Sequence, residues 1–265
     1  MKKTVSIAVL VLLCVLMCGS IVSAGTILEG VLKKGELVVG ITGDQPPLNA
    51  TTKEGEIIGL DADLARAIAM SMSVKIRFAK MPFAELLPAL QAGKVDMILS
   101  GMTMTPDRNL KVAFIGPYHV SGKGILTKLK ALESLKKEGI NSAQFKVATL
   151  KGSTSQYVVE KAAPKAKLTL TASYDDALNL LFQDKVDAVI ADYPFCAYVA
   201  ARYPDKGLAV GESKLSFEPL GIAVREDALW INGLENFIKM LMASGDMNVM
   251  QDKWFKGGAW IKQLP

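Results

Sequence analysis

A twelve-residue pattern occurs twice in this chain, and it constrains the fold more than any other sequence feature. Residues 90–101 read LQAGKVDMILSG and residues 181–192 read LFQDKVDAVIAD, so the two copies are 91 residues apart. Each copy reads as the end of a helix, a Lys-Val-Asp turn, an apolar strand and a short loop. A repeat at this spacing indicates two similar α/β lobes rather than a solenoid.

The loop after the first copy concentrates groups that suit a ligand. Ser100 and Gly101 are small enough to bring backbone close to a bound molecule. Met102 and Thr103 follow, and Arg108 then offers a planar guanidinium that matches a carboxylate. Because ligands in open α/β sheets bind at the carboxyl ends of strands, we expect these five residues to line a binding site. A solvated arginine beside turn residues is the alternative, since short motifs match by chance.

The second half of the chain offers matching chemistry. A strand at residues 146–150 is followed by Ser153 and Thr154, and a helix is expected from residue 156. Free N–H groups at that helix start would bind an anion, and ordinary capping by Ser or Thr is compatible with this role. Asp192 ends the second copy of the repeat. Arg108 and Asp192 facing one cleft would suit a zwitterion, with its carboxylate on Arg108 and its ammonium on Asp192.

Other acidic residues lie near predicted strand and helix ends. Asp44 lies in the loop that follows a first strand at residues 36–41. Asp61 is expected to cap a helix that runs to about Ser71, with Asp63 as a partner of the helix dipole. This interpretation is favoured over a pair of catalytic carboxylates because the two residues stand at a helix start.

The first 24 residues have the pattern of a secretory signal peptide. Lys2 and Lys3 form the charged start, residues 7–17 form an apolar core, and residues 22–24 read Val-Ser-Ala. Small residues at such a site predict cleavage and a mature start near Gly25. A membrane anchor is the alternative, but the apolar core is short for a spanning helix. We therefore expect a soluble protein in an exported compartment.

Cysteines, charge and histidine exclude several classes of protein. Cys14 and Cys18 lie in the leader without the small residues that precede a lipid-modified cysteine, so only Cys196 remains and no internal disulfide is expected. Without the two leader lysines, 29 basic residues face 26 acidic ones, and the basic residues are scattered, which disfavours nucleic-acid binding. His119 is the one histidine, more typical of a structural than a catalytic role, and no Cys/His spacing predicts a metal site.

Several short motifs together resemble a known family. The pattern is similar to the polar amino-acid solute-binding proteins of ABC importers, which have the type II periplasmic binding fold, over nearly all of the mature chain. The motifs that carry the resemblance are residues 59–65 (GLDADLA), 87–90 (LPAL), 100–105 (SGMTMT) with Arg108, 116–118 (GPY), 152–154 (GST) and 191–192 (AD).

The resemblance implies roles for particular residues. The guanidinium of Arg108 would bind the ligand carboxylate, helped by backbone at Thr103 and Thr154. Backbone at Gly101 and the carboxylate of Asp192 would hold the ammonium. An aromatic ring at Phe83 would pack on the ligand. The ligand-binding set that we expect is Asp44, Phe83, Ser100, Gly101, Met102, Thr103, Arg108, Ser153, Thr154 and Asp192.

The resemblance also implies two α/β lobes, each a mostly parallel sheet flanked by helices, with the ligand in the cleft between them. After a signal peptide at residues 1–24, lobe 1 would comprise residues 25–122 and 220–265, and lobe 2 would comprise residues 123–219. Two crossings, near residues 120–126 and 217–222, would form a hinge on which the lobes close. The family often has aromatics in the first-strand loop where this chain has Gln45 and Leu48, which puts the preference for a large cationic side chain in doubt.

The function that follows is capture of an amino acid or similar small zwitterion in the periplasm and its delivery to an ABC transporter permease. A monomer is expected, without cofactor, metal or catalytic residue. One alternative is a cyclohexadienyl dehydratase, which resembles these proteins and shares Gly43-Asp44. Those enzymes use a carboxylic acid three residues after Asp192, where this chain has Phe195, which cannot donate a proton. A sensor module that signals through a separate protein is the other alternative.

Overall fold

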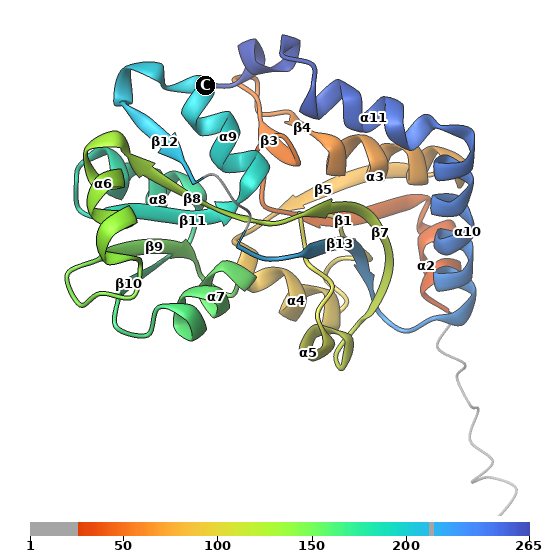
Figure 1. Cartoon of the computed structure of the whole chain (residues 1–265). Helices are drawn as coiled ribbons and strands as arrows, with labels where there is room; N and C mark the ends of the chain where they lie inside the picture. The colour runs from red at the N-terminus through yellow and green to blue at the C-terminus, as the bar shows by residue number, and fades with distance from the viewer. Residues whose placement is uncertain (1–25, 212–214) are drawn as a thin grey trace, which may run out of the picture.

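The chain folds into two α/β lobes that lie side by side. The computed structural model describes residues 26–211 and 215–265, so the predicted signal peptide lies outside the described residues. The described residues form two five-stranded sheets and a small three-stranded one. We call the half built on the first sheet lobe 1 and the half built on the second sheet lobe 2 (Figure 1).

The first sheet has the strand order β5-β1-β6-β13-β7. Strand β1 runs parallel to β5 and β6, whereas β13 is antiparallel to β6 and β7. The strands are β1 (Glu36–Ile41), β5 (Lys75–Lys80), β6 (Met97–Ile98), β7 (Ala113–Ser121) and β13 (Glu218–Val224). A hairpin sheet of β2 (Asp44–Gln45), β3 (Asn49–Thr51) and β4 (Ile57–Ile58) follows β1.

The second sheet repeats this arrangement with the order β10-β9-β11-β8-β12. Strand β9 is parallel to β10 and β11, and β8 is antiparallel to β11 and β12. The strands are β8 (Lys123–Lys128), β9 (Lys146–Leu150), β10 (Lys167–Thr171), β11 (Ala188–Asp192) and β12 (Leu208–Val210). The two copies of the sequence repeat supply β6 and β11, each next to the central parallel strand of its sheet.

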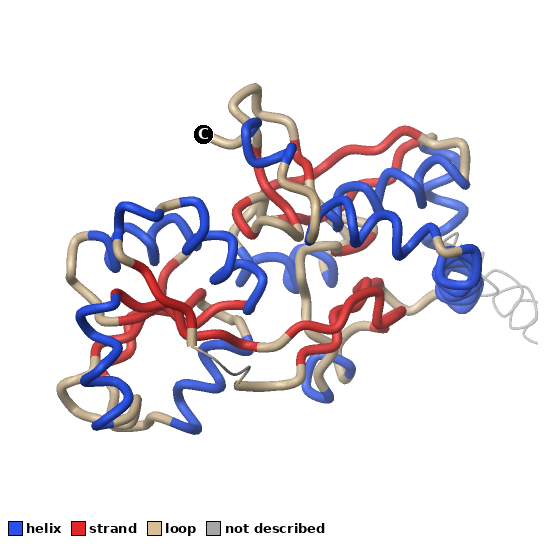
Figure 2. The backbone as a smooth tube through the Cα atoms, turned by 45° about the horizontal axis from the view of Figure 1, so that its top comes forward, coloured by secondary structure: helices blue, strands red, loops and turns tan. Residues whose placement is uncertain are grey.

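Helices cover both faces of each sheet (Figure 2). Lobe 1 contains α2 (Ile27–Lys34), α3 (Leu60–Ser71), α4 (Phe83–Gln91), α5 (Pro106–Asn109), α10 (Ala228–Ser244) and α11 (Asp246–Phe255). Lobe 2 contains α6 (Leu129–Glu138), α7 (Thr154–Ala162), α8 (Tyr174–Phe182), α9 (Tyr193–Arg202) and the 3₁₀ turn η1 (Pro204–Lys206). None of the described helices combines the length and apolar composition needed to cross a bilayer.

The apolar core is continuous between the lobes. One cluster of buried side chains packs α3 and α10 on the first sheet, through residues such as Leu64 and Leu234. Another joins α4 to α8, because Phe83 and Leu86 belong to the same buried cluster as Tyr174. The two lobes are therefore packed against each other, in a closed arrangement.

The local signals explain most of the element boundaries. Helix α2 begins with a capping box in which Thr26 Oγ1 accepts from the Glu29 N–H at 3.2 Å. It ends at Gly35, whose φ of +66° is favourable for glycine. The prediction that Asp61 caps α3 is wrong: Gly59, with φ +126°, precedes the helix, and Asp61 is buried inside it. Helix α7 begins at Thr154, two residues earlier than expected.

The C-terminal segment reaches from lobe 1 to lobe 2. After α11 the chain forms the 3₁₀ turn η2 (Ala259–Gln263) and lies beside α9 (Figure 1). The ring of Tyr198 in α9 stacks on Trp260 with centroids 5.4 Å apart. Arg202 Nη2 donates to the main-chain oxygen of Pro265 at 3.1 Å. The end of the chain therefore contacts both lobes.

Candidate functional site

The site is built where the strand ends of the two lobes face each other. From lobe 1, the loop after β6 runs beside β13, since Met104 N–H donates to the Pro219 carbonyl at 2.8 Å and Gly221 N–H to the Met102 carbonyl at 3.0 Å. This pairing places Thr103 next to Glu218. From lobe 2, the loops after β9 and β11 complete the site. The repeat therefore delivers two loops to one place, as the sequence predicts.

Arg108 connects the lobes directly. It lies in α5, whose cap Thr105 accepts the Arg108 N–H at 3.3 Å. Its Nη1 donates to the Thr103 carbonyl at 2.8 Å in lobe 1, and its Nη2 donates to the Gly152 carbonyl at 3.1 Å in lobe 2. The guanidinium lies 5.5 Å from the centre of the Phe83 ring, a cation–π contact. Burial lowers the pKa of Arg108, an effect that nearby Glu218 and Asp192 oppose.

Asp192 is buried and already paired within the protein. Lys123 lies directly opposite it across the β8–β11 pair, and Lys123 Nζ is 2.9 Å from Asp192 Oδ1. Gln45 of lobe 1 donates its Nε2 to Asp192 Oδ2 at 2.5 Å. Asp192 and Lys123 are each only 2% exposed. The carboxylate that the sequence assigns to a ligand ammonium thus has an ammonium of this chain beside it.

Glu218 is a second buried carboxylate at the same place. Its Oε2 accepts from Thr103 Oγ1 at 2.6 Å and from Thr154 Oγ1 at 2.8 Å, and the two hydroxyls are 3.3 Å apart. Its Oε1 accepts from Ser216 Oγ at 2.6 Å, and Lys123 Nζ lies 3.6 Å from Oε2. Burial alone would raise the pKa of Glu218, but Lys123 and these hydroxyl donors hold it below its usual value.

The loop residues Ser100 and Gly101 are held by lobe 1. Asp61 Oδ2 accepts from the Gly101 N–H and from Asn49 Nδ2, each at 2.9 Å, and Asp61 Oδ1 accepts from the Tyr118 hydroxyl at 2.7 Å. Burial raises the pKa of Asp61 to about 7. Gly101 has φ +57°, a value that favours glycine, and a Cβ there would meet Gln45 at 2.7 Å. Asp61 is a positioning residue for this loop.

The remaining expected site residues have different surroundings. Met102 is fully buried and its side chain belongs to the core. Ser153 Oγ accepts from the Gln156 N–H at 3.3 Å, so Ser153 caps α7. Asp44 Oδ2 accepts from the Tyr174 N–H across the lobes at 2.9 Å, while Asp44 Oδ1 is buried without a hydrogen-bond partner. Burial raises the pKa of Asp44.

The structure brings together Arg108, Thr103, Thr154 and Asp192, and places Phe83 under the guanidinium. Sequence reasoning missed Lys123 and Glu218, and it named Gln45 as a departure in the first-strand loop without including it in the binding set. Charged residues within otherwise apolar strand segments were the available signal for Lys123 and Glu218, because such residues are rarely buried unless they are paired. Whether any of these groups contacts a ligand stays a prediction.

Phe195, at the position of the dehydratase acid, and His119, the one histidine, both pack against aromatic rings. Phe195 is 2% exposed and its ring lies 4.4 Å from that of Tyr174. His119 stacks on Phe255 with centroids 4.4 Å apart. The described residues contain no group of three or more His, Cys, Asp or Glu side chains that could hold a metal ion.

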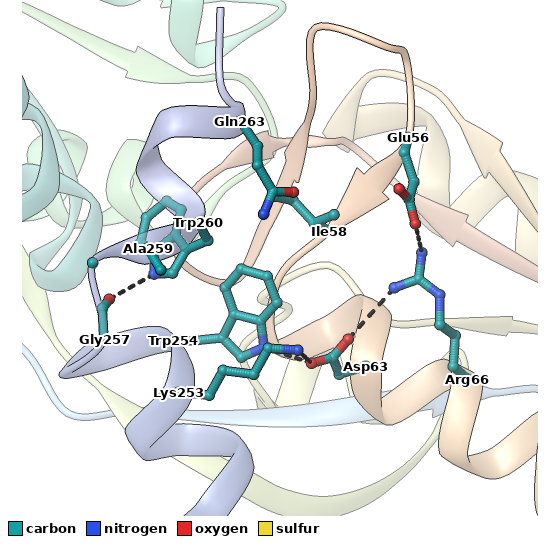
Figure 3. Close-up of a pocket in the computed structure, with 11 residues that line it drawn as sticks. Glu56, Ile58, Asp63, Arg66, Lys253, Trp254, Gly257, Ala259, Trp260 and Gln263 are labelled. Carbon is teal, nitrogen blue, oxygen red and sulfur yellow. Dashed lines mark hydrogen bonds and ion pairs between the residues drawn. The ribbon is translucent and has the colours of Figure 1, made fainter.

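A pocket outside the cleft has a structural explanation. It lies between α3, α11 and η2, and Asp63 of α3 is one of the residues that line it (Figure 3). Asp63 Oδ2 accepts from Lys253 Nζ at 2.5 Å and from Trp254 Nε1 at 2.8 Å, and Arg66 Nη1 lies 3.5 Å from Asp63 Oδ1. The bonds from Lys253 and Trp254 hold α11 on α3.

Comparison with known proteins agrees with this architecture. The model of the bacterial extracellular solute-binding proteins, family 3, matches residues 37–257. ABC transporter arginine-binding protein 1 of Escherichia coli is 29% identical over 223 residues, which cover 82% of this chain and 89% of that protein. A glutamine-binding protein of Geobacillus stearothermophilus is 30% identical over 224 residues, covering 81% of this chain and 82% of that protein.

Solved structures give the same result. An ancestral amino acid-binding protein, described as a precursor of cyclohexadienyl dehydratase, superposes with a TM-score of 0.80 at 34% identity, covering 87% of this chain and all of that one. A binding component of an ABC transporter from Wolinella succinogenes, complexed with lysine, has a TM-score of 0.80 at 31% identity, covering 86% and 99%. The relatives named here are thus described as binding proteins. The two-lobe fold, the paired strand-end loops and these matches together show that the chain belongs to the bacterial extracellular solute-binding proteins, family 3.

Proposed function

We propose that this protein captures an amino acid, or a small analogue of one, in the cleft between its lobes and delivers it to the permease of an ABC transporter. The observation that carries the proposal is the position of Arg108. Its guanidinium spans the two lobes, and the bonds to Thr103 and Gly152 use two of its five N–H groups. The other three are free to bind a carboxylate in the cleft.

The proposal also covers the movement of the lobes, the location of the protein and the absence of turnover. Residues 25–122 and 220–265 would move against residues 123–219, with the hinge near residues 120–126 and 217–222. The protein would work in the periplasm as a monomer, after removal of residues 1–24. Binding without turnover is proposed because Phe195, at the position of the dehydratase acid, offers no proton.

A ligand panel tests this proposal. Mature protein is unfolded by heat in the presence of amino acids, carboxylates without an ammonium, and arogenate. A solute that binds only the folded state raises the melting temperature by mass action. Turnover of arogenate would instead favour the dehydratase alternative.

The matched variants are Arg108→Ala and Lys151→Ala. Removing Arg108 should weaken binding of the identified solute by about 2–5 kcal/mol, because the solute carboxylate is left buried and unpaired. Lys151 is exposed near the cleft and uses no hydrogen bond to the groups described above, so its substitution should change binding by less than about 1 kcal/mol. Equal binding by wild type and Arg108→Ala would contradict the proposal.

A further inference from the structure

Lys123 lies where a bound amino acid would be expected to place its ammonium group. Its Nζ is 2.9 Å from Asp192 and 3.6 Å from Glu218, and all three side chains are at most 4% exposed. Strand register sets this arrangement, because Lys123 and Asp192 are direct partners in the β8–β11 pair. The lysine therefore belongs to the framework of lobe 2, and its place does not depend on a mobile loop.

The carboxylate oxygens of this cluster are all engaged. Asp192 Oδ1 accepts a hydrogen bond from Lys123 Nζ, and Asp192 Oδ2 accepts one from Gln45 Nε2. Glu218 Oε1 receives Ser216, and Glu218 Oε2 receives the hydroxyls of two threonines. Asp44, a buried carboxylate outside the cluster whose Oδ1 has no hydrogen-bond partner, lines a different pocket. Each carboxylate oxygen in the cluster thus has at least one donor within the protein, and Asp192 has Lys123 as its cationic partner.

Hydrogen-bond donors, in contrast, remain available. Arg108 has three N–H groups beyond those bonded to Thr103 and Gly152. An ammonium group has three donors, so Lys123 retains at least one beyond its bonds to the two carboxylates. The cluster therefore offers donors to a solute from both Arg108 and Lys123.

A second ammonium group would be unfavourable here. To reach Asp192, the α-ammonium of an amino acid would have to lie beside Lys123 Nζ in a site shielded from water. Like charges that face each other at a buried interface repel strongly, because the local dielectric is low. An oxygen acceptor in the same place would instead receive a hydrogen bond from Lys123.

We propose that Lys123 takes the place of the ligand ammonium, so that the solute is a small carboxylic acid with an α-oxygen acceptor, a 2-oxo or 2-hydroxy acid. This inference rests on the proposed function, because it assumes that Arg108 holds the solute carboxylate. Lys123 is then the residue that sets the solute class. A neutral donor at this position, which would leave Asp192 free to pair with an ammonium, should reverse the preference.

The experiment compares matched pairs of solutes by calorimetric titration. Three sets pair a 2-oxo acid with an amino acid: 2-oxoglutarate with glutamate, phenylpyruvate with phenylalanine, and 4-methyl-2-oxopentanoate with leucine. Two further sets pair a 2-hydroxy acid with an amino acid: lactate with alanine, and malate with aspartate. Wild type should bind the 2-oxo or 2-hydroxy member of at least one set at least tenfold more tightly than its amino partner. Lys123→Gln keeps a donor to Asp192 but removes the charge, so it should bind the amino partner more tightly. Lys151→Gln, the same substitution at an exposed lysine, should behave as wild type.

A further variant protects the test against misfolding of Lys123→Gln. Lys123→Arg keeps a positive charge and hydrogen-bond donors beside Asp192, so it should keep the preference for the oxygen-bearing member, and a folded variant with that preference separates loss of charge from loss of structure. Wild type binding an amino acid as tightly as its 2-oxo partner would overturn the inference. If that binding were lost in Arg108→Ala, the proposed function would still stand. Binding of no solute by wild type or by either variant would overturn both.

Discussion

The two lobes use the same turn in the same way. Asp96 in lobe 1 donates its N–H to the Val38 carbonyl and accepts the Val38 N–H on Oδ2, both at 2.8 Å. Asp187 in lobe 2 makes the same pair of bonds, both at 2.8 Å, with the backbone of Lys146. In each lobe the aspartate of the Lys-Val-Asp turn therefore ties the strand it precedes to the central parallel strand.

The lobes differ at the other end of these strands. In lobe 1 the repeat ends at Gly101, whose N–H is held by the buried carboxyl of Asp61. In lobe 2 the equivalent position is Asp192, which is paired with Lys123. The shared turn builds the scaffold, and the strand ends, 91 residues apart in sequence, are free to differ. At these two equivalent positions lobe 1 has a backbone N–H, whereas lobe 2 has a carboxylate paired with a lysine.

The largest expected effect concerns Asp61, which holds the strand end of lobe 1, and the dependence of the free energy of unfolding on pH. Burial raises the pKa of Asp61 to about 7, so the folded state holds this proton more tightly than the unfolded state. The stability that Asp61 contributes is therefore fully present below about pH 4 and is lost as the pH rises to about 7, by up to about 4 kcal/mol. Asp61→Asn should remove this loss. Urea unfolding of both proteins between pH 4 and 8 measures it, and parallel stability curves would contradict the assignment.

The next largest effect on the free energy of unfolding concerns Asp192, at the equivalent strand end of lobe 2. Asp192→Ala should lower the free energy of unfolding by about 3 kcal/mol, because Lys123 is left buried with only Glu218 nearby at 3.6 Å. The double variant Asp192→Ala/Lys123→Met should recover most of this loss, since no unpaired charge remains. Urea unfolding of the single and double variants provides the measurement. Additive losses in the double variant would mean that the pair is not coupled.

The smallest effect compares the shared turns. Asp96→Ala should cost about 2 kcal/mol of unfolding free energy, because Asp96 is buried and also pairs with Lys34 at 3.0 Å. Asp187→Ala should cost about 1 kcal/mol, because Asp187 is half-buried and its bond to Lys146 is accessible to water. Denaturant unfolding of both variants checks the order. A larger loss for Asp187→Ala than for Asp96→Ala would contradict the expectation that burial strengthens the bonds of the turn in lobe 1.

The sequence predicts the two-lobe fold well because the repeated pattern of helix end, turn and strand marks the corresponding strand in each of the two sheets. The loops that carry Arg108 and Asp192 were also predicted, since they follow directly from the strand ends. The pairing of Asp192 with Lys123 was not, because it depends on the register between β8 and β11, which joins residues far apart in the chain. Asp61 was misassigned because a helix start with an aspartate is usually a cap, whereas here Tyr118 and Gly101 draw the carboxyl inward.

The C-terminal segment gives the protein an internal optical reporter. Trp260 belongs to the segment that follows lobe 1, and it stacks on Tyr198 of lobe 2 and lies 5.6 Å from Trp254. A separation of the lobes would pull Tyr198 away from the indole and expose the indole to water. Intrinsic fluorescence would therefore follow such a separation of the lobes without an attached dye.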